Sequence, residues 1–449
     1  MPISFSMMRR AAALAVVLPV ALPVALAAQS ALTLNASERA IASAVDSHNA
    51  EALVLLERIV NINSGTMNFA GVRQVGDVLR TQFDALEFKT HWVDGAPFHR
   101  AGHLVAEHAG PGPKILLVGH LDTVFEPTNP FQRFERLNDS TARGPGVIDM
   151  KGGDVIILYA LRALKEAGAL DRMNVTIVFD GDEEDAGTPT LLARQTLIDA
   201  AKGATAALGF EDGAGDPKTA VISRRSAGGW TLTTTGITAH SGQIFTPEYG
   251  AGAVYEASRI LTGFYTQLAG EQYLTFNPGL ALGGTQVKVG NDGTDGSASG
   301  KSNVVADQMT VTGDLRSLSP EQQAKAKSTM REIVSHHLPK TSAEITFDDG
   351  YPPMAPTAGN RRLLAMYDEG SRALGFGPVV AVDPSRAGAA DVSFIASEVP
   401  MIIDAIGLSG HDDHSAQETA DLSKLPSQTK RAALLMYRLT TAGAPLAKP

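Results

Sequence analysis

The sequence predicts an α/β fold: a mainly parallel, twisted sheet with helices on both faces, interrupted by an inserted α+β domain. Short apolar runs alternate with helical patterns as far as Glu211, which is the order expected of parallel strands joined by crossover helices. Near Ser226 the pattern changes to half-exposed, alternating strands such as Trp230–Thr235. The first pattern returns after residue 340, so we expect the block between to be an insertion.

The N-terminus has the pattern of a secretory signal peptide at residues 1–27. Arg9 and Arg10 precede an apolar stretch that is short for a membrane span and ends in a small-x-small cleavage site at Ala25–Ala27. The alternative is an uncleaved membrane anchor. We expect a secreted or periplasmic protein that has no membrane contact after the signal is removed.

Composition narrows the class of protein further. The chain has 449 residues, 44% of them hydrophobic, which suffices for two domains or one domain with an insertion. Its formal net charge of -10 argues against nucleic acid or an anionic membrane as the main partner. The chain contains no cysteine, so any metal must be held by His, Asp and Glu, which suits Zn²⁺, Mn²⁺ or Co²⁺.

Local patterns place the individual elements. The first domain comprises residues 28–225 and 341–449, with helices expected at about 37–59, at about 71–86 and after Gly153. The insert comprises residues 226–340, with strands at 286–289 and 308–315 and a helix at about 252–268. A second helix of the insert should begin after Ser319, because a Ser cap, a Pro and a capping-box Gln322 follow one another there. Gly290–Gly300 has the composition of a flexible loop.

Two histidines and three acids form a candidate metal site: His120, Asp149, Glu184, Glu211 and His414. Three of the five follow closely on short apolar runs, and Asp149 lies in a loop that opens a helix. The carboxyl ends of strands in an open α/β sheet are where ligands bind, so residues remote in sequence can meet there. Two imidazoles and three carboxylates can hold two divalent metals, which suggests hydrolysis.

Each candidate also has a plainer interpretation. His120 and Asp122 face the same way on a strand, so Asp122 can fix the imidazole tautomer, but they could be unrelated polar residues at a loop start. Asp149 can bridge two metals or simply cap a helix. The acids Asp182–Glu184 would sit together in a solvated turn, or around a cation, with Glu184 as ligand and Glu183 as general base.

Three further residues remain open at this point. His411 and His414 lie three apart in a loop, and spacing alone does not decide which of them binds metal. His240, in the insert, has the alternative of a polar surface residue. Arg316 could clamp a carboxylate with its planar guanidinium or lie on a strand surface.

Together these motifs resemble those of the co-catalytic di-zinc exopeptidase and deacylase family, over essentially the whole mature chain. The family includes the secreted, folate-hydrolysing glutamate carboxypeptidases, to which the likeness is greatest, as well as succinyl-diaminopimelate desuccinylase, acetylornithine deacetylase and aminoacylase. The motifs that carry the resemblance are His120–Thr123, Gly146–Gly153, Asp182–Glu184, Phe210–Glu211, Ala239–Ser241, Asn303 and His414–Glu418.

The resemblance implies a role for each residue. One zinc would be held by His120, Glu211 and a bridging Asp149, and the other by Glu184, His414 and the same Asp149, so that His414 is preferred to His411. Glu183 would be the catalytic base and Asp122 the partner of His120. In the insert, which would be a lid and dimerisation domain, His240 would reach into the active site of the partner subunit of a homodimer. Asn303 and Arg316 would bind the substrate carboxylate.

The implied activity is that of a secreted di-zinc carboxypeptidase, which hydrolyses the amide bond before a C-terminal amino acid, with glutamate as one candidate. The alternatives are an N-acyl-amino-acid deacylase or dipeptidase with the same machinery, and a catalytically silent binding protein. Tyr351 stands where the folate-cleaving enzymes lead us to expect an Arg, Ser385–Asp391 departs from their Gly-rich form, and Gly290–Gly300 is longer than usual. These departures bear on substrate choice and leave the metal chemistry untouched.

Overall fold

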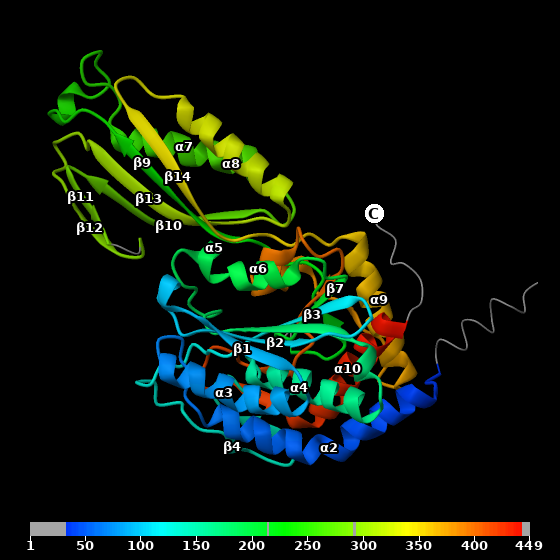
Figure 1. Ribbon diagram of the computed structural model, residues 1–449. Helices are drawn as coiled ribbons and strands as arrows, with labels where there is room; N and C mark the ends of the chain where they lie inside the picture. The colour runs from blue at the N-terminus through cyan, green and yellow to red at the C-terminus, as the bar shows by residue number, and fades with distance from the viewer. Residues whose placement is uncertain (1–32, 213–214, 291–292, 442–449) are drawn as a thin grey trace, which may run out of the picture.

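The computed structural model describes residues 33–212, 215–290 and 293–441, which form two domains (Figure 1). The predicted signal peptide, residues 1–27, lies outside the described residues. The larger domain is built on a six-stranded sheet with helices on both sides, and the smaller one on a four-stranded sheet. The predicted α/β architecture with an inserted α+β block is thus confirmed.

The large sheet has the strand order β1-β2-β6-β3-β7-β16. Its central strands β6, β3, β7 and β16 run parallel to one another, whereas β1 and β2 are antiparallel to their neighbours at one edge. The predominance of parallel pairs puts the carboxyl ends of three apolar strands side by side. The strands are β1 (Lys89–Asp94), β2 (Gly102–His108), β3 (Lys114–His120), β6 (Asn174–Asp180), β7 (Ala206–Gly209) and β16 (Ile402–Ile403).

Alternate residues of the strands belong to cores on opposite faces of this sheet. In β3, Ile115 and Leu117 join one core, while Leu116 and Val118 join the other. Because both faces are covered, the central strands are apolar without interruption. The first face is covered by α2 (Ala36–Val60), α3 (Phe69–Ala85), α4 (Lys151–Glu166), α9 (Ala358–Ala373) and α10 (Leu425–Thr441), and the second by α6 (Gln195–Ala201) and neighbouring short turns.

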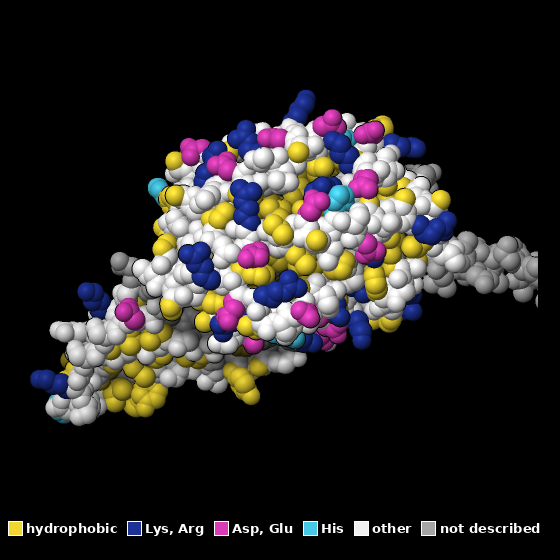
Figure 2. Space-filling model, turned by 90° about the horizontal axis from the view of Figure 1, so that it is seen from below, with side chains coloured by type: hydrophobic (Ala, Val, Ile, Leu, Met, Phe, Trp, Pro, Cys, Tyr) yellow, Lys and Arg dark blue, Asp and Glu magenta, His cyan; other side chains and the backbone are white. Residues whose placement is uncertain are grey.

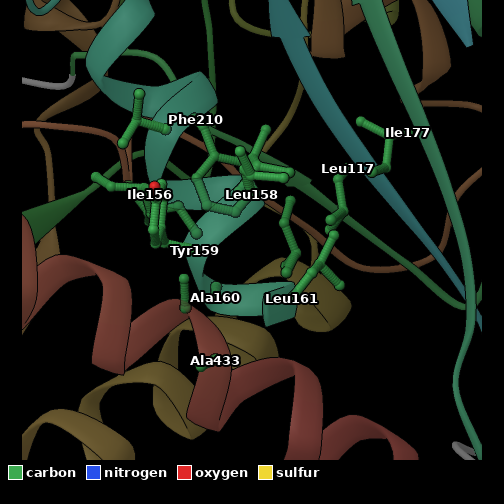
Figure 3. Close-up of a cluster of buried hydrophobic side chains, with 14 of the residues drawn as sticks. Leu117, Ile156, Leu158, Tyr159, Ala160, Leu161, Ile177, Phe210 and Ala433 are labelled. Atoms are coloured by element: carbon green, nitrogen blue, oxygen red, sulfur yellow. The ribbon is translucent and has the colours of Figure 1, made fainter. Parts of the chain in front are cut away.

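Helix α4 lies at the centre of the larger core. Figure 3 shows its side chains between strand residues such as Leu117 and Ile177 and the helix residue Ala433 of α10. Leu161 and Ala160 are both fully buried, as are most residues around this helix. The buried residues of α4 run from Lys151 to Leu164, with Arg162 as the exception, so the packing around this helix fixes where its N-terminal end lies. That end carries the loop with Asp149.

The smaller domain is an antiparallel sheet with the strand order β10-β13-β9-β14, covered on one face by two helices. Its elements are β9 (Ala227–Thr235), α7 (Ala253–Leu268), β10 (Thr275–Gly284), β13 (Gln308–Arg316), α8 (Pro320–Ser335) and β14 (Ser342–Tyr351), with a hairpin of β11 (Gln286–Val289) and β12 (Gly296–Ser299). The helix predicted after Ser319 is confirmed, and Ser319 accepts a hydrogen bond from the Gln322 N–H. The sheet runs to Tyr351, whereas the sequence placed the end of the insert at residue 340, because β14 pairs with β9.

Two chain segments join the domains and pair with each other. Arg224 and Met354 exchange both backbone hydrogen bonds, at 2.9 Å each, and Tyr351 is in register with Ala227. These segments form the hinge, at one end of the small sheet (Figure 1). Strand β9 leads away from the hinge, so the loop after Thr235 lies about 25 Å further out at the usual rise per residue.

The surface carries no dominant charge on the face shown in Figure 2, where acidic and basic side chains are interspersed. Among the described residues, no helix combines the length and apolar character needed to cross a bilayer.

Candidate active site

The parallel strands bring the predicted residues to one edge of the sheet. His120 is the last residue of β3 and lies in register with Asp180, the last residue of β6. The acidic residues Asp182–Glu184 follow two residues later, and Glu211 follows β7 on the other side of β3. Local strand order therefore accounts for three of the five candidate ligands.

The N-terminal loop of α4 packs against the same edge because glycines allow a close approach. A Cβ at Gly153 would lie 2.1 Å from the carbonyl oxygen of Phe210, and one at Gly152 would lie 2.5 Å from the Cβ of Leu408. Side chains larger than hydrogen are thus excluded at both positions. The close packing places Asp149 beside Glu211, the residue that follows Phe210.

The five candidates form two groups that share Asp149. In the first, His120 Nε2 lies 3.1 Å from Asp149 Oδ1 and 3.5 Å from Glu211 Oε1. In the second, His414 Nε2 lies 2.9 Å from Asp149 Oδ2 and 3.0 Å from Glu184 Oε2. Asp149 thus directs one oxygen to each group, which is the arrangement a carboxylate needs to bridge two ions.

The structure distinguishes the two histidines that the sequence left open. His414 belongs to the second group, whereas His411 lies in β17 (Gly410–His411) and is in none of the His/Asp/Glu groups among the described residues. His414 adopts a positive φ of 57° in the loop between β17 and β18 (Thr419–Asp421).

Electrostatics show that the site demands positive charge. Hydrogen bonds to Asp149 and Glu184 raise the pKa of His414 to about 11. Burial opposes the charged form of His120, but Glu211 and its other acidic neighbours raise its pKa well above the ordinary value. Burial and the nearby Asp149 raise the pKa of Glu184 to about 7. The acidic groups at this edge of the sheet therefore favour positive charge, which bound metal ions would supply.

The donor set fits two divalent cations. Glu184 Oε1 is buried and has no hydrogen-bond partner among the described residues. Asp149 is 7% exposed and His120 is 1% exposed, so bulk water solvates neither side chain well. One imidazole and two carboxylates per group match what Zn²⁺, Mn²⁺ and Co²⁺ accept.

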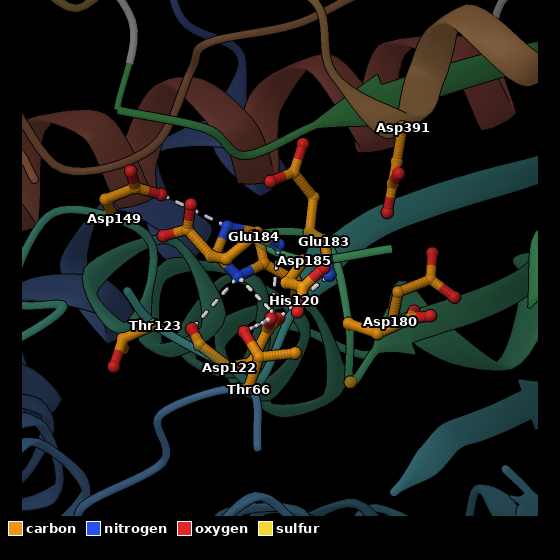
Figure 4. Close-up of polar contacts among 12 residues, drawn as sticks. Thr66, His120, Asp122, Thr123, Asp149, Asp180, Glu183, Glu184, Asp185 and Asp391 are labelled. Atoms are coloured by element: carbon orange, nitrogen blue, oxygen red, sulfur yellow. Dashed lines mark hydrogen bonds and ion pairs between the residues drawn. The ribbon is translucent and has the colours of Figure 1, made fainter. Parts of the chain in front are cut away.

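Asp122 connects His120 to the acidic loop (Figure 4). His120 Nδ1 lies 3.2 Å from the Asp122 backbone carbonyl and 3.4 Å from Asp122 Oδ1. The same Oδ1 accepts the Glu183 N–H at 3.0 Å. Its Oδ2 accepts the Glu184 N–H at 3.1 Å and the Thr66 hydroxyl at 2.6 Å. One fully buried carboxylate therefore orients an imidazole and fixes the backbone of the next two candidate residues. Thr66 carried no recognisable signal in the sequence.

Glu183 differs from its neighbours in having a free carboxylate. Its side chain has no hydrogen bond or ion pair with a described residue, although it is coupled electrostatically to His120, Glu184 and Asp149. Burial raises its pKa to about 8, with a further contribution from Glu184, while His120 opposes the rise. A carboxylate of raised pKa beside a metal group is suited to accept a proton.

Glu418 holds the loop that carries Asp149, a role the sequence did not reveal. Its carboxylate accepts the N–H groups of Gly146 at 3.0 Å, Ile148 at 2.9 Å and Asp149 at 3.3 Å. Gly146 has a φ of +70°, which a larger residue would adopt only with strain. The only sequence signal for Glu418 was its place in the motif that begins at His414.

A third group of possible ligands, His103, Asp180 and Asp182, lies buried behind the acidic loop. His103 Nδ1 lies 3.0 Å from Asp180 Oδ1 and accepts the Gly181 N–H at 3.3 Å, and Nε2 lies 2.8 Å from the carbonyl of Ala193, so both ring nitrogens have partners. The fully buried Arg194 binds Asp182 Oδ1 at 2.7 Å. Because a histidine and an arginine already supply positive charge, we assign this group a structural role.

The candidates in the small domain are not brought to the metal groups. His240 and Asn303 are exposed and adjacent, with the Ser241 N–H donating to the Asn303 carbonyl at 2.9 Å. They lie beyond the outer end of β9. Arg316 lies at the hinge end of β13, where its Nε is 3.0 Å from Asp314 Oδ2. The structure thus separates Arg316 from His240 and Asn303.

Comparison with known proteins agrees with this geometry. Residues 116–438 match the family described as Peptidase family M20/M25/M40. Carboxypeptidase G2 of Pseudomonas sp. (strain RS-16) is 29% identical over 392 residues, covering 86% of this chain and 88% of that protein.

Solved structures show the same fold at low sequence identity. The aminopeptidase PepT from Bacillus cereus ATCC 10987 matches with a TM-score of 0.69 at 18% identity, over 87% of this chain and 98% of that one. The YXEP protein of Bacillus subtilis, described as a dinuclear metal binding peptidase from the M20 family, matches with a TM-score of 0.59 at 16% identity. The match covers 88% of this chain and 99% of that one. By its sequence match, its two-domain fold and its paired ligand groups, this chain belongs to the M20/M25/M40 peptidase family.

Proposed function

We propose that the protein is a di-zinc exopeptidase of the carboxypeptidase type, which hydrolyses the amide bond before a C-terminal amino acid. The observation that carries the proposal is Asp149, which directs one oxygen to each of two histidine-carboxylate groups beside a free Glu183. The overall similarity to carboxypeptidase G2 supports the carboxypeptidase type. An N-acyl-amino-acid deacylase or dipeptidase with the same residues is the second candidate, favoured by Tyr351 in place of an expected Arg.

Each group of side chains has a distinct task in this proposal. His120, Glu211 and Asp149 hold one metal ion, and Glu184, His414 and Asp149 hold the other. Bound metals would supply Lewis acidity and lower the pKa of an attacking water toward neutrality. Zn²⁺ suits this donor set, and Mn²⁺ or Co²⁺ are possible substitutes.

The chain's own residues move the proton and orient the substrate. Glu183 accepts a proton from the attacking water and delivers it to the leaving amine. Asp122 keeps His120 in one tautomer and fixes the Glu183 backbone. Arg316, at the hinge end of the small domain, is a proposed contact of the substrate carboxylate. Asn303, which lies beside His240 at the other end, is proposed to reach that carboxylate in the partner subunit. The substrate is a small peptide or an N-acyl amino acid.

We predict that the two groups lose metal differently when their ligands are changed. Asp149→Ala removes the shared ligand, so both ions should be lost, whereas His414→Ala should cost about one ion per chain because the His120 group stays intact. Metal content after dialysis, measured by inductively coupled plasma mass spectrometry, checks this. His411→Ala is the matched control and should keep both ions. Equal metal content in all three variants would refute the bridging assignment.

The activity itself is tested with a panel of peptidyl and N-acyl amino acids. The zinc-loaded protein should release the C-terminal amino acid, and Glu183→Gln should lower kcat by at least about 100-fold while the metal content is unchanged. Asp185→Asn, an exposed neighbour, is the control. Rates that depend mainly on the C-terminal residue of the substrate support the carboxypeptidase. Rates that depend mainly on the acyl group support the deacylase. Wild-type rates in Glu183→Gln would exclude this residue as the base.

We also propose that the protein is a homodimer in which His240 completes the active site of the partner subunit. His240 and Asn303 lie at the outer end of the small sheet, remote from the metal groups of their own chain. Helix α7 exposes Tyr255 near its start and Tyr265 further along, at 54% and 71%, and Phe245 of the preceding loop contacts Tyr255 with ring centroids 5.3 Å apart. Exposed apolar side chains gathered on one helix favour a protein interface.

Mixed dimers test whether His240 acts across the interface. His240→Ala and Glu183→Gln should each be nearly inactive, but equal amounts refolded together should recover about a quarter of wild-type activity, since half of the dimers have one complete site. If the mixture remains as inactive as its parts, His240 acts within its own chain or not at all.

Secretion is the remaining part of the proposal. It rests on the signal pattern of residues 1–27 alone, and it agrees with a chain that contains no cysteine and therefore needs no particular redox environment. N-terminal sequencing of protein recovered from the periplasm or medium should begin after Ala27.

A further inference from the structure

Tyr351 occupies an unusual place between the two domains. It is the last residue of β14 and lies in register with Ala227, the first residue of β9, so it belongs to the hinge. Its ring packs edge-on against Phe394 of the large domain, with centroids 4.9 Å apart. A tyrosine held at a hinge in this way links the two domains through its ring and through its hydroxyl.

The hydroxyl of Tyr351 contacts the acidic loop. It donates to the backbone carbonyl of Glu183 at 2.9 Å and accepts from Arg194 Nη2 at 2.8 Å. Among the described residues, this is the one hydrogen bond between the small domain and residues 182–187. Burial, followed by the nearby Asp391, raises the pKa of Tyr351 well above its ordinary value, so the hydroxyl stays a neutral donor.

Arg194 continues the same network on the other side. Its Nη2 also donates to the Asp182 carbonyl at 2.9 Å, and its Nε binds Asp391 Oδ1 at 2.6 Å. Two successive carbonyls of the acidic loop are therefore held by one arginine and one tyrosine. The N–H of the Asp182–Glu183 peptide group is held as well, because Asp122 accepts the Glu183 N–H at 3.0 Å.

We propose that Tyr351 is a positioning residue, whose hydroxyl fixes the backbone of the base Glu183 and ties it to the hinge of the small domain. The inference rests on the proposed role of Glu183. The Glu183 side chain has no partner of its own among the described residues, so its direction is set by its backbone. With the N–H bound by Asp122 and the C=O bound by Tyr351, both peptide groups that flank its Cα are fixed. A rotation of the small domain that moved Tyr351 would leave the second of these peptide groups held on one side alone, by the Glu184 N–H that Asp122 Oδ2 accepts at 3.1 Å.

The test compares Tyr351→Phe, which removes only the hydroxyl, with Tyr351→Leu, which also removes the ring. Loss of the hydroxyl should lower kcat about tenfold and leave KM within about twofold, because the base is misplaced while the substrate contacts remain. Both variants should show the same loss of kcat. Tyr367→Phe is the matched control, since Tyr367 of α9 is another buried tyrosine and its hydroxyl lies beside Arg431 of α10. Its kcat should equal that of the wild type.

Amide hydrogen exchange of the peptide that covers residues 181–187 gives a second readout, independent of activity. Exchange in this segment should be faster in Tyr351→Phe than in the wild type and in Tyr367→Phe. Unchanged exchange and kcat in Tyr351→Phe would overturn the proposal. So would a higher KM at unchanged kcat, which indicates a substrate contact, or a loss confined to Tyr351→Leu, which indicates ring packing.

Failure of the proposed function would look different. If the wild type hydrolyses no amide of the panel, the assignment of Glu183 as base fails. The exchange comparison then still decides whether the Tyr351 hydroxyl holds the loop.

Discussion

The structure depends on one electrostatic constraint, the gathering of carboxylates at the carboxyl edge of a buried parallel sheet. Asp149, Glu184 and Glu211 converge there, and two imidazoles alone do not satisfy all of their oxygens. Unpaired charges that are shielded from water are costly, so such a cluster persists only if cations compensate it. The raised pKa values of His120 and His414 express the same demand. Two divalent metals would meet it, one in each of the two groups that share Asp149.

A second layer of buried groups fixes the residues that surround this cluster. Asp122 holds His120 and the N–H groups of the acidic loop, Glu418 holds the loop of Asp149, and Arg194 holds Asp182. Each of these charged side chains forms hydrogen bonds with backbone groups or an ion pair with an opposite charge. The free Glu183 carboxylate is thus presented on a rigid support, which is what proton transfer at a defined position requires.

Much of this could be predicted from the sequence because the signals are local. The cap and capping-box residues predicted the start of the helix at Pro320. The apolar runs before His120 and Glu211 predicted two strands, and hence that these two residues meet at one edge of the sheet. The choice of His414 over His411 needed the family resemblance, since a loop position follows no periodicity. The end of the small domain at Tyr351 was missed because it depends on the pairing of β14 with β9, more than 100 residues apart. The contact of Tyr351 with Glu183 spans 168 residues and has no local signature.

The most direct test of the account is anomalous diffraction from crystals of the zinc-loaded protein, recorded on both sides of the zinc absorption edge. Two peaks should appear about 3.5 Å apart on either side of the Asp149 carboxylate, one beside His120 and the other beside His414. A single peak, or peaks beside His103 and not beside Asp149, would contradict the claim that this cluster is organised around two cations.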